Sequence, residues 1–272
     1  MSAEIYAARA ALHFWEEPCI SGKSGSGTVF FSGCNLRCVY CQNREISRGE
    51  AGKAISAERL RDIFLSLESK GAANINLVTP THYVPQIVRA LELAKEAGMK
   101  LPVVYNSSGY ERVETLLLLE GLVDIYLPDM KYSRSESAAR YSGAPDYPER
   151  VKEALAEMVR QTGSVAFSEE TGMLKRGVVV RHLVLPGHVK EAGEIIRYLV
   201  NSFGDRIYIS IMNQYTPCTE LADYPELDRK VTKREYERVL KEALDAGVEN
   251  GFSQEGGTAK ESFIPPFTGE GI

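Results

Sequence analysis

The sequence lacks any apolar run that approaches the roughly 20 residues needed to span a bilayer. Its first residues, 1–11, include Glu4 and no long apolar stretch, so neither a signal peptide nor a membrane anchor is expected. Runs of Lys or Arg are also absent, and the formal net charge is -5, which argues against nucleic acid as a partner. These absences predict a cytoplasmic protein that binds neither a membrane nor nucleic acid.

Cysteine is scarce and unevenly placed. The chain has 5 cysteines in 272 residues, and three of them are Cys34, Cys38 and Cys41. An odd count with this clustering does not suit a secreted disulfide framework, and in a reducing compartment it points to metal binding or redox work. The length allows a core without disulfides. A hydrophobic content of 44% and a charged content of 25% exclude disordered and fibrous classes.

The sequence does contain a repeated alternation of strand-like and helix-like segments. A helix expected from Ser56, for example, carries Leu60, Ile63, Phe64 and Leu67 at helical spacing and stops at Gly71. The alternation predicts an α/β fold of parallel strands with outer helices, in an open or a barrel-like sheet. Six strands are expected, at 28–31, 75–78, 103–105, 123–127, 178–185 and 207–211.

Polar residues follow these strands. Sites in parallel α/β folds lie at the C-terminal ends of the strands, so the segments there are expected to form one pocket. Ordinary polar loops are the alternative. The residues concerned are Cys34, Thr79 to His82, Asn106 to Gly109, Asp129, Lys131, Asn213 and Gln214.

The three clustered cysteines have the spacing C-x3-C-x2-C. Thiolates are soft ligands that suit iron–sulfur clusters, zinc and copper(I), and a complete structural site usually has four protein ligands. With three, one iron of a four-iron four-sulfur cluster stays open to an exogenous ligand. We therefore predict such a cluster on Cys34, Cys38 and Cys41. A zinc site completed by Cys19, Cys218 or His82, and structural cysteines without metal, remain alternatives.

The text Phe31 to Asn43, with an aromatic residue before the third cysteine, resembles the radical S-adenosylmethionine (SAM) superfamily. Within it, the text is similar to the activating enzymes of glycyl radical enzymes, such as pyruvate formate-lyase activating enzyme. The segments Trp15 to Gly22 and Asn76 to His82 resemble an uncharacterised branch of those activases. The likeness extends over roughly 15–217.

This resemblance implies a partial barrel of six strand–helix units with the cluster loop after the first strand. We expect one domain over 1–272, with a core at about 26–215, an N-terminal extension at 1–25, and a C-terminal helix and irregular tail at 216–272.

The resemblance also implies a reaction. One electron from the cluster cleaves SAM into methionine and a 5′-deoxyadenosyl radical, which abstracts a hydrogen atom. Flavodoxin or ferredoxin would supply the electron, and a glycyl radical enzyme would be the partner of an activase-like protein. A radical enzyme acting on a small molecule or peptide, and a non-catalytic zinc or cluster scaffold, remain open.

Several site residues follow from the resemblance alone. Tyr40 occupies the aromatic position near the adenine of SAM. Asp129 and Lys131 match an Asp-x-Lys that binds the methionyl part. Arg181 is expected to pair with the carboxylate of SAM or with another acidic group.

The chain also departs from the family pattern. Thr79-Pro80-Thr81-His82 replaces a Gly-Gly-Glu, so the hydroxyls of Thr79 and Thr81 are expected to accept from the SAM amino group. Asn106 and Ser107 replace an Asp-Thr that helps to hold a monovalent cation, which puts that cation in doubt. Asn213 stands where activases commonly have histidine. Cys19 and Cys218 are expected to be small buried hydrophobes.

Overall fold

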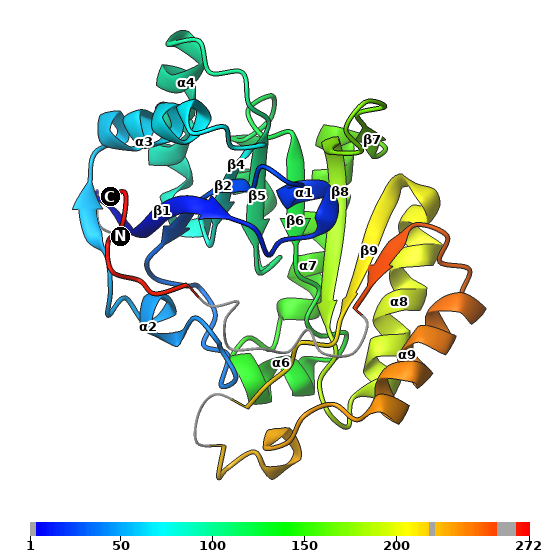
Figure 1. The fold of residues 1–272 in the computed structure, drawn as a ribbon. Helices are drawn as coiled ribbons and strands as arrows, with labels where there is room; N and C mark the ends of the chain where they lie inside the picture. Colours follow the sequence, from blue (N-terminus) through cyan, green and yellow to red (C-terminus); the bar gives the residue numbers. More distant parts are fainter. Residues whose placement is uncertain (1–3, 218–220, 255–264) are drawn as a thin grey trace.

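The computed structural model describes residues 4–217, 221–254 and 265–272, and one large sheet organises them (Figure 1). The order in the sheet is β10-β9-β8-β6-β5-β4-β2-β1-β3. Neighbours are parallel from β10 to β2, whereas β1 is antiparallel to both β2 and β3. The strands are β1 (Ile5–His13), β2 (Ser26–Phe31), β3 (Lys53–Ile55), β4 (Ile75–Val78), β5 (Val103–Ser107), β6 (Ile125–Pro128), β8 (Leu174–Leu183), β9 (Ile207–Met212) and β10 (Gly251–Ser253), with β7 (Ala166–Phe167) paired to β8.

Helices connect the parallel strands and cover the outer face of the sheet. In α3 all four apolar residues expected at helical spacing are buried, and Ser56 caps the helix by accepting a hydrogen bond from the backbone of Arg59. The helices are α1 (Pro18–Ser21), α2 (Arg44–Ser47), α3 (Ala57–Ser69), α4 (Val84–Glu96), α5 (Val113–Leu117), α6 (Ser135–Ser142), α7 (Tyr147–Thr162), α8 (Val189–Phe203) and α9 (Lys233–Asp245), with 3-10 turns η1 (Thr81–Tyr83), η2 (Gly204–Arg206) and η3 (Pro225–Leu227).

The predicted α/β fold with parallel strands and outer helices is confirmed. The six expected strands correspond to β2, β4, β5, β6, β8 and β9. The sequence pattern did not indicate β1, β3 or β10. The last two have only three residues each, which is too short for a readable alternation, and β1 is rich in alanine.

The segment between β1 and β2 lies on the concave face of the sheet. Helix α1 lies in front of β5 and β6 in Figure 1, on the concave face of the sheet. Cys19 and Ile20 pack there against an apolar set near the N-terminal ends of the strands. We call this set, which is Cys19, Ile20, Val104, Ile125, Leu127, Leu174 and Val179, the apolar half of the concave face. Residues 1–25, expected as an extension, thus contribute both a strand and this inner helix where they are described.

The described C-terminal residues, 265–272, run along β1 without forming a helix or strand. Gly269 donates its backbone N–H to the carbonyl of Ala8, and Ala10 donates to that of Glu270. The two ends of the chain therefore lie close together (Figure 1). The rest of the expected irregular tail, 256–264, and Cys218 lie outside the described residues.

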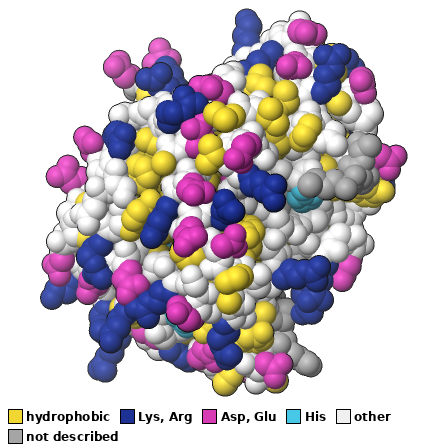
Figure 2. Space-filling model, turned by 180° about the vertical axis from the view of Figure 1, so that it is seen from behind, with side chains coloured by type: hydrophobic (Ala, Val, Ile, Leu, Met, Phe, Trp, Pro, Cys, Tyr) yellow, Lys and Arg dark blue, Asp and Glu magenta, His cyan; other side chains and the backbone are white. Residues whose placement is uncertain are grey.

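Figure 2 shows the face opposite to that of Figure 1, where Lys and Arg side chains lie interspersed with Asp and Glu. Within the described parts of the chain, no helix is both long and apolar enough to span a membrane.

Candidate active site

The cysteine loop begins directly after β2 and is fixed at its start. The backbone N–H of Gly33 donates to the carbonyl of Ile46 at 2.7 Å. Gly33 has a φ of 91°, and a Cβ there would lie 2.8 Å from Nε2 of His82. That nitrogen lies 3.0 Å from the carbonyl oxygen of Ser32. Glycine thus lets the imidazole pack against the first turn of the loop, next to Cys34.

The end of α6 holds the middle of the same loop. Arg37 donates its backbone N–H to the carbonyl of Ser142 at 3.3 Å, and Val39 donates to that of Tyr141 at 2.9 Å. The Ser142 hydroxyl donates to Sγ of Cys38 at 3.0 Å. Cys38 is therefore held by contacts on both sides and at its sulfur.

The chemistry of the three thiols fits the predicted cluster. Burial raises the pKa of the Cys34 thiol to about 11, so binding a metal there must displace a proton. Burial also raises the pKa of Cys38, although Lys131 and Ser142 oppose the rise. No three His, Cys, Asp or Glu side chains of the described residues are placed to hold a single metal ion. A cubane spreads its thiolates farther apart than a single ion does, and three soft donors on one loop suit it.

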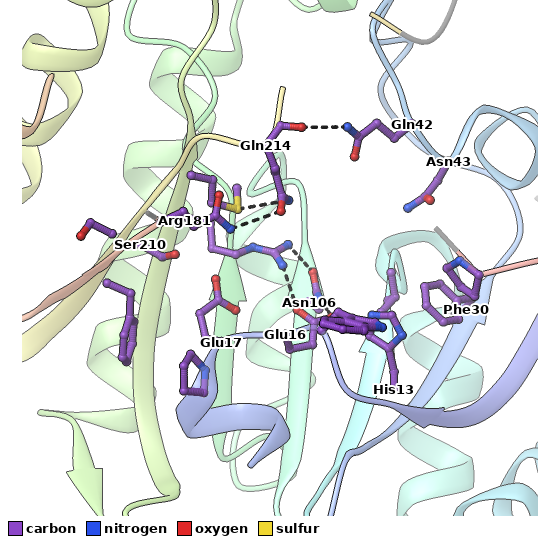
Figure 3. Close-up of a pocket in the computed structure, with 18 of the residues that line it drawn as sticks. His13, Glu16, Glu17, Phe30, Gln42, Asn43, Asn106, Arg181, Ser210 and Gln214 are labelled. Carbon is purple, nitrogen blue, oxygen red and sulfur yellow. Dashed lines mark hydrogen bonds and ion pairs between the residues drawn. The ribbon is translucent and has the colours of Figure 1, made fainter. Parts of the chain in front are cut away.

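Arg181, on the concave face of β8, is the centre of a partly buried charged network beside this loop (Figure 3). Its Nε donates to Oδ1 of Asp129 at 3.0 Å, and its Nη2 donates to Oδ1 of Asn106 at 2.6 Å. Its Nη1 donates to Oε2 of Glu16 at 3.2 Å. The structure thus brings together three predicted residues from three neighbouring strands, and it adds Glu16.

Asp129 is shared between two cations. Its Oδ2 accepts from Nζ of Lys131 at 2.5 Å. Burial alone would raise the pKa of Asp129, but Lys131 and Arg181 outweigh it and lower that pKa. Burial alone would likewise lower the pKa of Lys131, yet Asp129 and the Cys38 thiol raise it overall. The aspartate is therefore ionised and the lysine charged, close to the cysteine loop.

Glu16 is not among the site residues predicted from the sequence. Its Oε1 accepts from the side-chain amides of Asn76 and Asn106, at 3.1 and 3.2 Å. Burial raises its pKa, and Arg181 opposes the rise. The acidic pair directly before Pro18 could have indicated a functional role for Glu16. However, Glu16 lies 90 positions before Asn106, the nearest predicted residue of the network.

Above this network is a cavity of about 510 Å³ (Figure 3). Segment 13–18 and residues of β2, β4, β5, β8, β9 and β10 line it. Glu17 points into it from the N-terminal segment, is only 9% exposed, and its Oε2 has no hydrogen-bond partner among the described residues. Across the cavity, Nε2 of Gln42 donates to the carbonyl of Gln214 at 3.2 Å and so joins the cysteine loop to the segment after β9.

Thr79, directly after β4, has a φ of 59°, and it is the one non-glycine residue with positive φ in the described parts of the chain. That conformation is costly for a β-branched residue and is typical of functional sites. Its N–H donates to the carbonyl of Asn106 at 2.9 Å. Thr81 instead donates its hydroxyl proton to Glu111, at 2.7 Å. Burial raises the pKa of Glu111 to about 7.

The other predicted residues make contacts outside this network. The Ser107 hydroxyl accepts from the N–H of Gly109 at 3.2 Å, and Asn213 donates its backbone N–H to Gln254 at 2.8 Å. The Tyr40 side chain is buried, with its hydroxyl 2.7 Å from that of Tyr132.

The chain is similar in sequence to known proteins. The chain is 30% identical to the uncharacterized protein MJ0674 of Methanocaldococcus jannaschii over 245 residues, which are 87% of this chain and 66% of that protein. This chain thus spans just under two-thirds of that relative's length. It is 24% identical to the pyruvate formate-lyase-activating enzyme of Clostridium pasteurianum over 191 residues, which are 67% of this chain and 71% of that enzyme.

Solved structures share the fold at low sequence identity. Streptococcus suis SuiB bound to the precursor peptide SuiA has a TM-score of 0.55 at 15% identity, over 82% of this chain and 47% of that one. Methylornithine synthase (PylB) has a TM-score of 0.52 at 15% identity, over 81% of this chain and 68% of that one. Residues 28–199 match the Radical SAM superfamily, and the chain belongs to this family.

Proposed function

We propose that the protein binds a four-iron four-sulfur cluster through Cys34, Cys38 and Cys41, cleaves SAM reductively, and abstracts hydrogen from a substrate. The observation that carries the proposal is the placement of the paired Asp129 and Lys131 beside the cysteine loop, near enough for Lys131 to influence the Cys34 and Cys38 thiols. When bound, the cluster supplies the electron that splits the sulfonium bond of SAM.

The residues of the chain then bind and orient SAM. Lys131 supplies a partly buried positive charge for the methionyl carboxylate, and Asp129 fixes its position. The strained turn at Thr79 turns polar backbone toward the same edge of the sheet. The roles proposed for Tyr40, Thr81, Asn106, Ser107, Arg181 and Asn213 in holding SAM rest on the family resemblance.

For the substrate, we propose an activase-like role in which a glycyl radical enzyme is the partner. The similarity to the activating enzyme of Clostridium pasteurianum supports this role. The test is hydrogen transfer: the protein should take deuterium from a glycine-deuterated peptide of a glycyl radical enzyme into 5′-deoxyadenosine. No transfer from any such peptide would contradict the role.

One observation favours a small molecule instead. The cavity of about 510 Å³ is within the size range of small-molecule sites, and the N-terminal segment forms part of its wall. Its polar lining includes the unpartnered oxygen of Glu17. Transfer of deuterium from a labelled metabolite would support this second candidate over the activase.

We also propose that an acidic electron donor such as flavodoxin or ferredoxin docks beside the cysteine loop. Cys34 and Cys38 line a hollow of about 540 Å³ together with Arg37, Arg44 and Arg48. The three arginines are exposed and form no ion pair within the described residues. Like any electrostatically steered encounter, electron transfer should slow as ionic strength rises.

The deciding experiment is electron paramagnetic resonance of anaerobically reconstituted, reduced protein. We expect a cubane signal that changes when SAM is added, with formation of 5′-deoxyadenosine. Zinc in place of iron would overturn the proposal.

Lys131→Ala should weaken SAM binding by about tenfold or more, which is about 1.4 kcal/mol. It should keep its iron, because Asp129 stays paired with Arg181. Lys190→Ala, at an exposed position, is the matched control.

A further inference from the structure

Three buried hydroxyl groups form a chain that ends on a cluster cysteine. The hydroxyls of Tyr40 and Tyr132 lie 2.7 Å apart, and that of Tyr132 lies 2.7 Å from Oγ of Ser142. Oγ of Ser142 lies 3.0 Å from Sγ of Cys38. Tyr40, at 5% exposed, is the most exposed of the three residues, so the three hydroxyl groups are shielded from solvent. We call these three residues the hydroxyl relay.

Tertiary packing fixes each member. Tyr40 belongs to the cysteine loop, Tyr132 follows β6, and Ser142 is the last residue of α6. The ring of Tyr132 packs edge-on against that of Tyr147, with centroids 5.5 Å apart. The two backbone hydrogen bonds between the loop and the end of α6 hold Ser142 against Cys38. The relay therefore joins three elements at one sulfur atom.

Proton counting sets the direction of the relay. A metal-bound thiolate carries no proton, so Cys38 can only accept, and Ser142 must donate its single hydroxyl proton to it. Ser142 then accepts from Tyr132, because its own proton is already used. For the same reason, Tyr132 accepts from Tyr40. All three O–H groups point toward the sulfur, and such an aligned chain strengthens its last bond.

We propose that the hydroxyl relay raises the reduction potential of the cluster, with Ser142, Tyr132 and Tyr40 as positioning residues. The inference rests on the cluster proposed above. One-electron reduction, with the electron taken from the external donor, adds negative charge that is shared by the ligand sulfurs. A hydrogen bond to a sulfur stabilises that charge more in the reduced than in the oxidised state, and such bonds are among the levers that set cluster potentials.

The test is a redox titration of reconstituted holoenzyme without SAM, followed by the resonance signal of the reduced cluster. Ser142→Ala should lower the equilibrium constant of one-electron reduction about tenfold, a shift of about 59 mV to more negative potential. Tyr132→Phe should lower it about threefold, because Ser142 still donates to Cys38 but without support. Tyr40→Phe should have a smaller effect in the same direction, and Ser142→Thr should restore the potential.

Tyr126→Phe is the matched control. Tyr126 is fully buried, and its hydroxyl donates to Gln161 at 2.6 Å, outside the relay, so its removal should not shift the potential. An unchanged potential in Ser142→Ala, with full iron content, would overturn the proposal. If Ser142→Ala holds no iron, the two tyrosine variants decide, and wild-type potentials in both would overturn it.

The titration needs no SAM. Failure of SAM cleavage with normal potentials therefore argues against the proposed function alone. A wild-type protein that binds no cluster would refute both.

Discussion

The two halves of the concave face of the sheet bury different kinds of side chain. Toward the N-terminal ends of the strands, the apolar half packs Ile20 of α1 on side chains such as Val104 and Ile125. Toward the C-terminal ends, Arg181 on β8 and Asp129 after β6 are largely buried, and Arg181 pairs with both Asp129 and Glu16. We call this second set, with Asn106 and Lys131, the polar half.

The two halves differ in what they contribute to the stability of the protein. The apolar half gains stability from area removed from water. The polar half buries charges, which contributes little or nothing to stability even when every charge is paired. Its arrangement suits the SAM site that we propose at the carboxyl ends of the parallel strands. Removing a single charge from the polar half should nevertheless destabilise the protein, because it leaves the partner charge unpaired.

The largest expected effect is in the cysteine loop above the polar half. Cys34→Ala should abolish SAM cleavage and remove most of the iron, because a cubane then lacks one of its three protein ligands. Cys19→Ala, in the apolar half, should keep the iron, since the Cys19 thiol is buried among apolar side chains, where burial raises its pKa to about 12. Iron analysis of both variants checks this, and full iron in Cys34→Ala would contradict the ligand assignment.

Next in size is Arg181→Met, which removes the cation that pairs with both Glu16 and Asp129. Leaving a buried charge without its partner costs about 3–5 kcal/mol, so we expect that loss in the free energy of unfolding in urea. Arg238→Met, at an exposed position on α9, is the control and should change stability by about 0.5 kcal/mol or less. If Arg181→Met lost no more stability than the control, the ion pairs of Arg181 with Glu16 and Asp129 would not be needed to keep the buried charges in place.

Ile20→Ala tests the apolar half directly. Ile20 is fully buried, and truncation of such a side chain costs about 2–5 kcal/mol. The iron content of the folded protein should not change, because Ile20 lies away from the cysteine loop. Leu244→Ala, with 74% of the residue exposed, serves as the control. If Ile20→Ala lost iron but not stability, the apolar half would contribute to the cluster site rather than to stability.

The smallest expected effect concerns Glu111, a buried carboxylate influenced by hydroxyls of Thr81, Ser107 and Tyr105 rather than by a cation. Its pKa in the folded protein is about 7, above the ordinary 4.5, so the folded state binds more protons between these values. Stability should therefore fall as pH rises from about 4.5 to about 7.

Glu111→Gln removes this titration. It should be more stable than the wild-type protein by about 3 kcal/mol at pH 8, and by about 1 kcal/mol or less at pH 5. Urea unfolding at both pH values measures the difference. An equal difference at pH 5 and pH 8 would show that Glu111 does not titrate in this range.

Much of the fold could be read from local patterns. The six parallel strands and the helix α3 follow from short apolar runs and helical spacing, which depend on neighbours a few residues away. The cysteine spacing is equally local. Strands β1, β3 and β10 could not be read, because they are short or alanine-rich and gain their place only by pairing with a sheet that already exists.

The candidate site, too, could be predicted from local sequence patterns only in part. Local patterns predicted the cysteine loop and placed Asn106, Asp129 and Arg181 after or within neighbouring strands, because parallel strands bring their carboxyl ends to one edge. The pairing of Glu16 with Arg181 and the contact of Ser142 with Cys38 could be seen only in the folded chain. Those contacts join residues 165 and 104 positions apart, and no local pattern encodes a distance that the packing of whole elements sets.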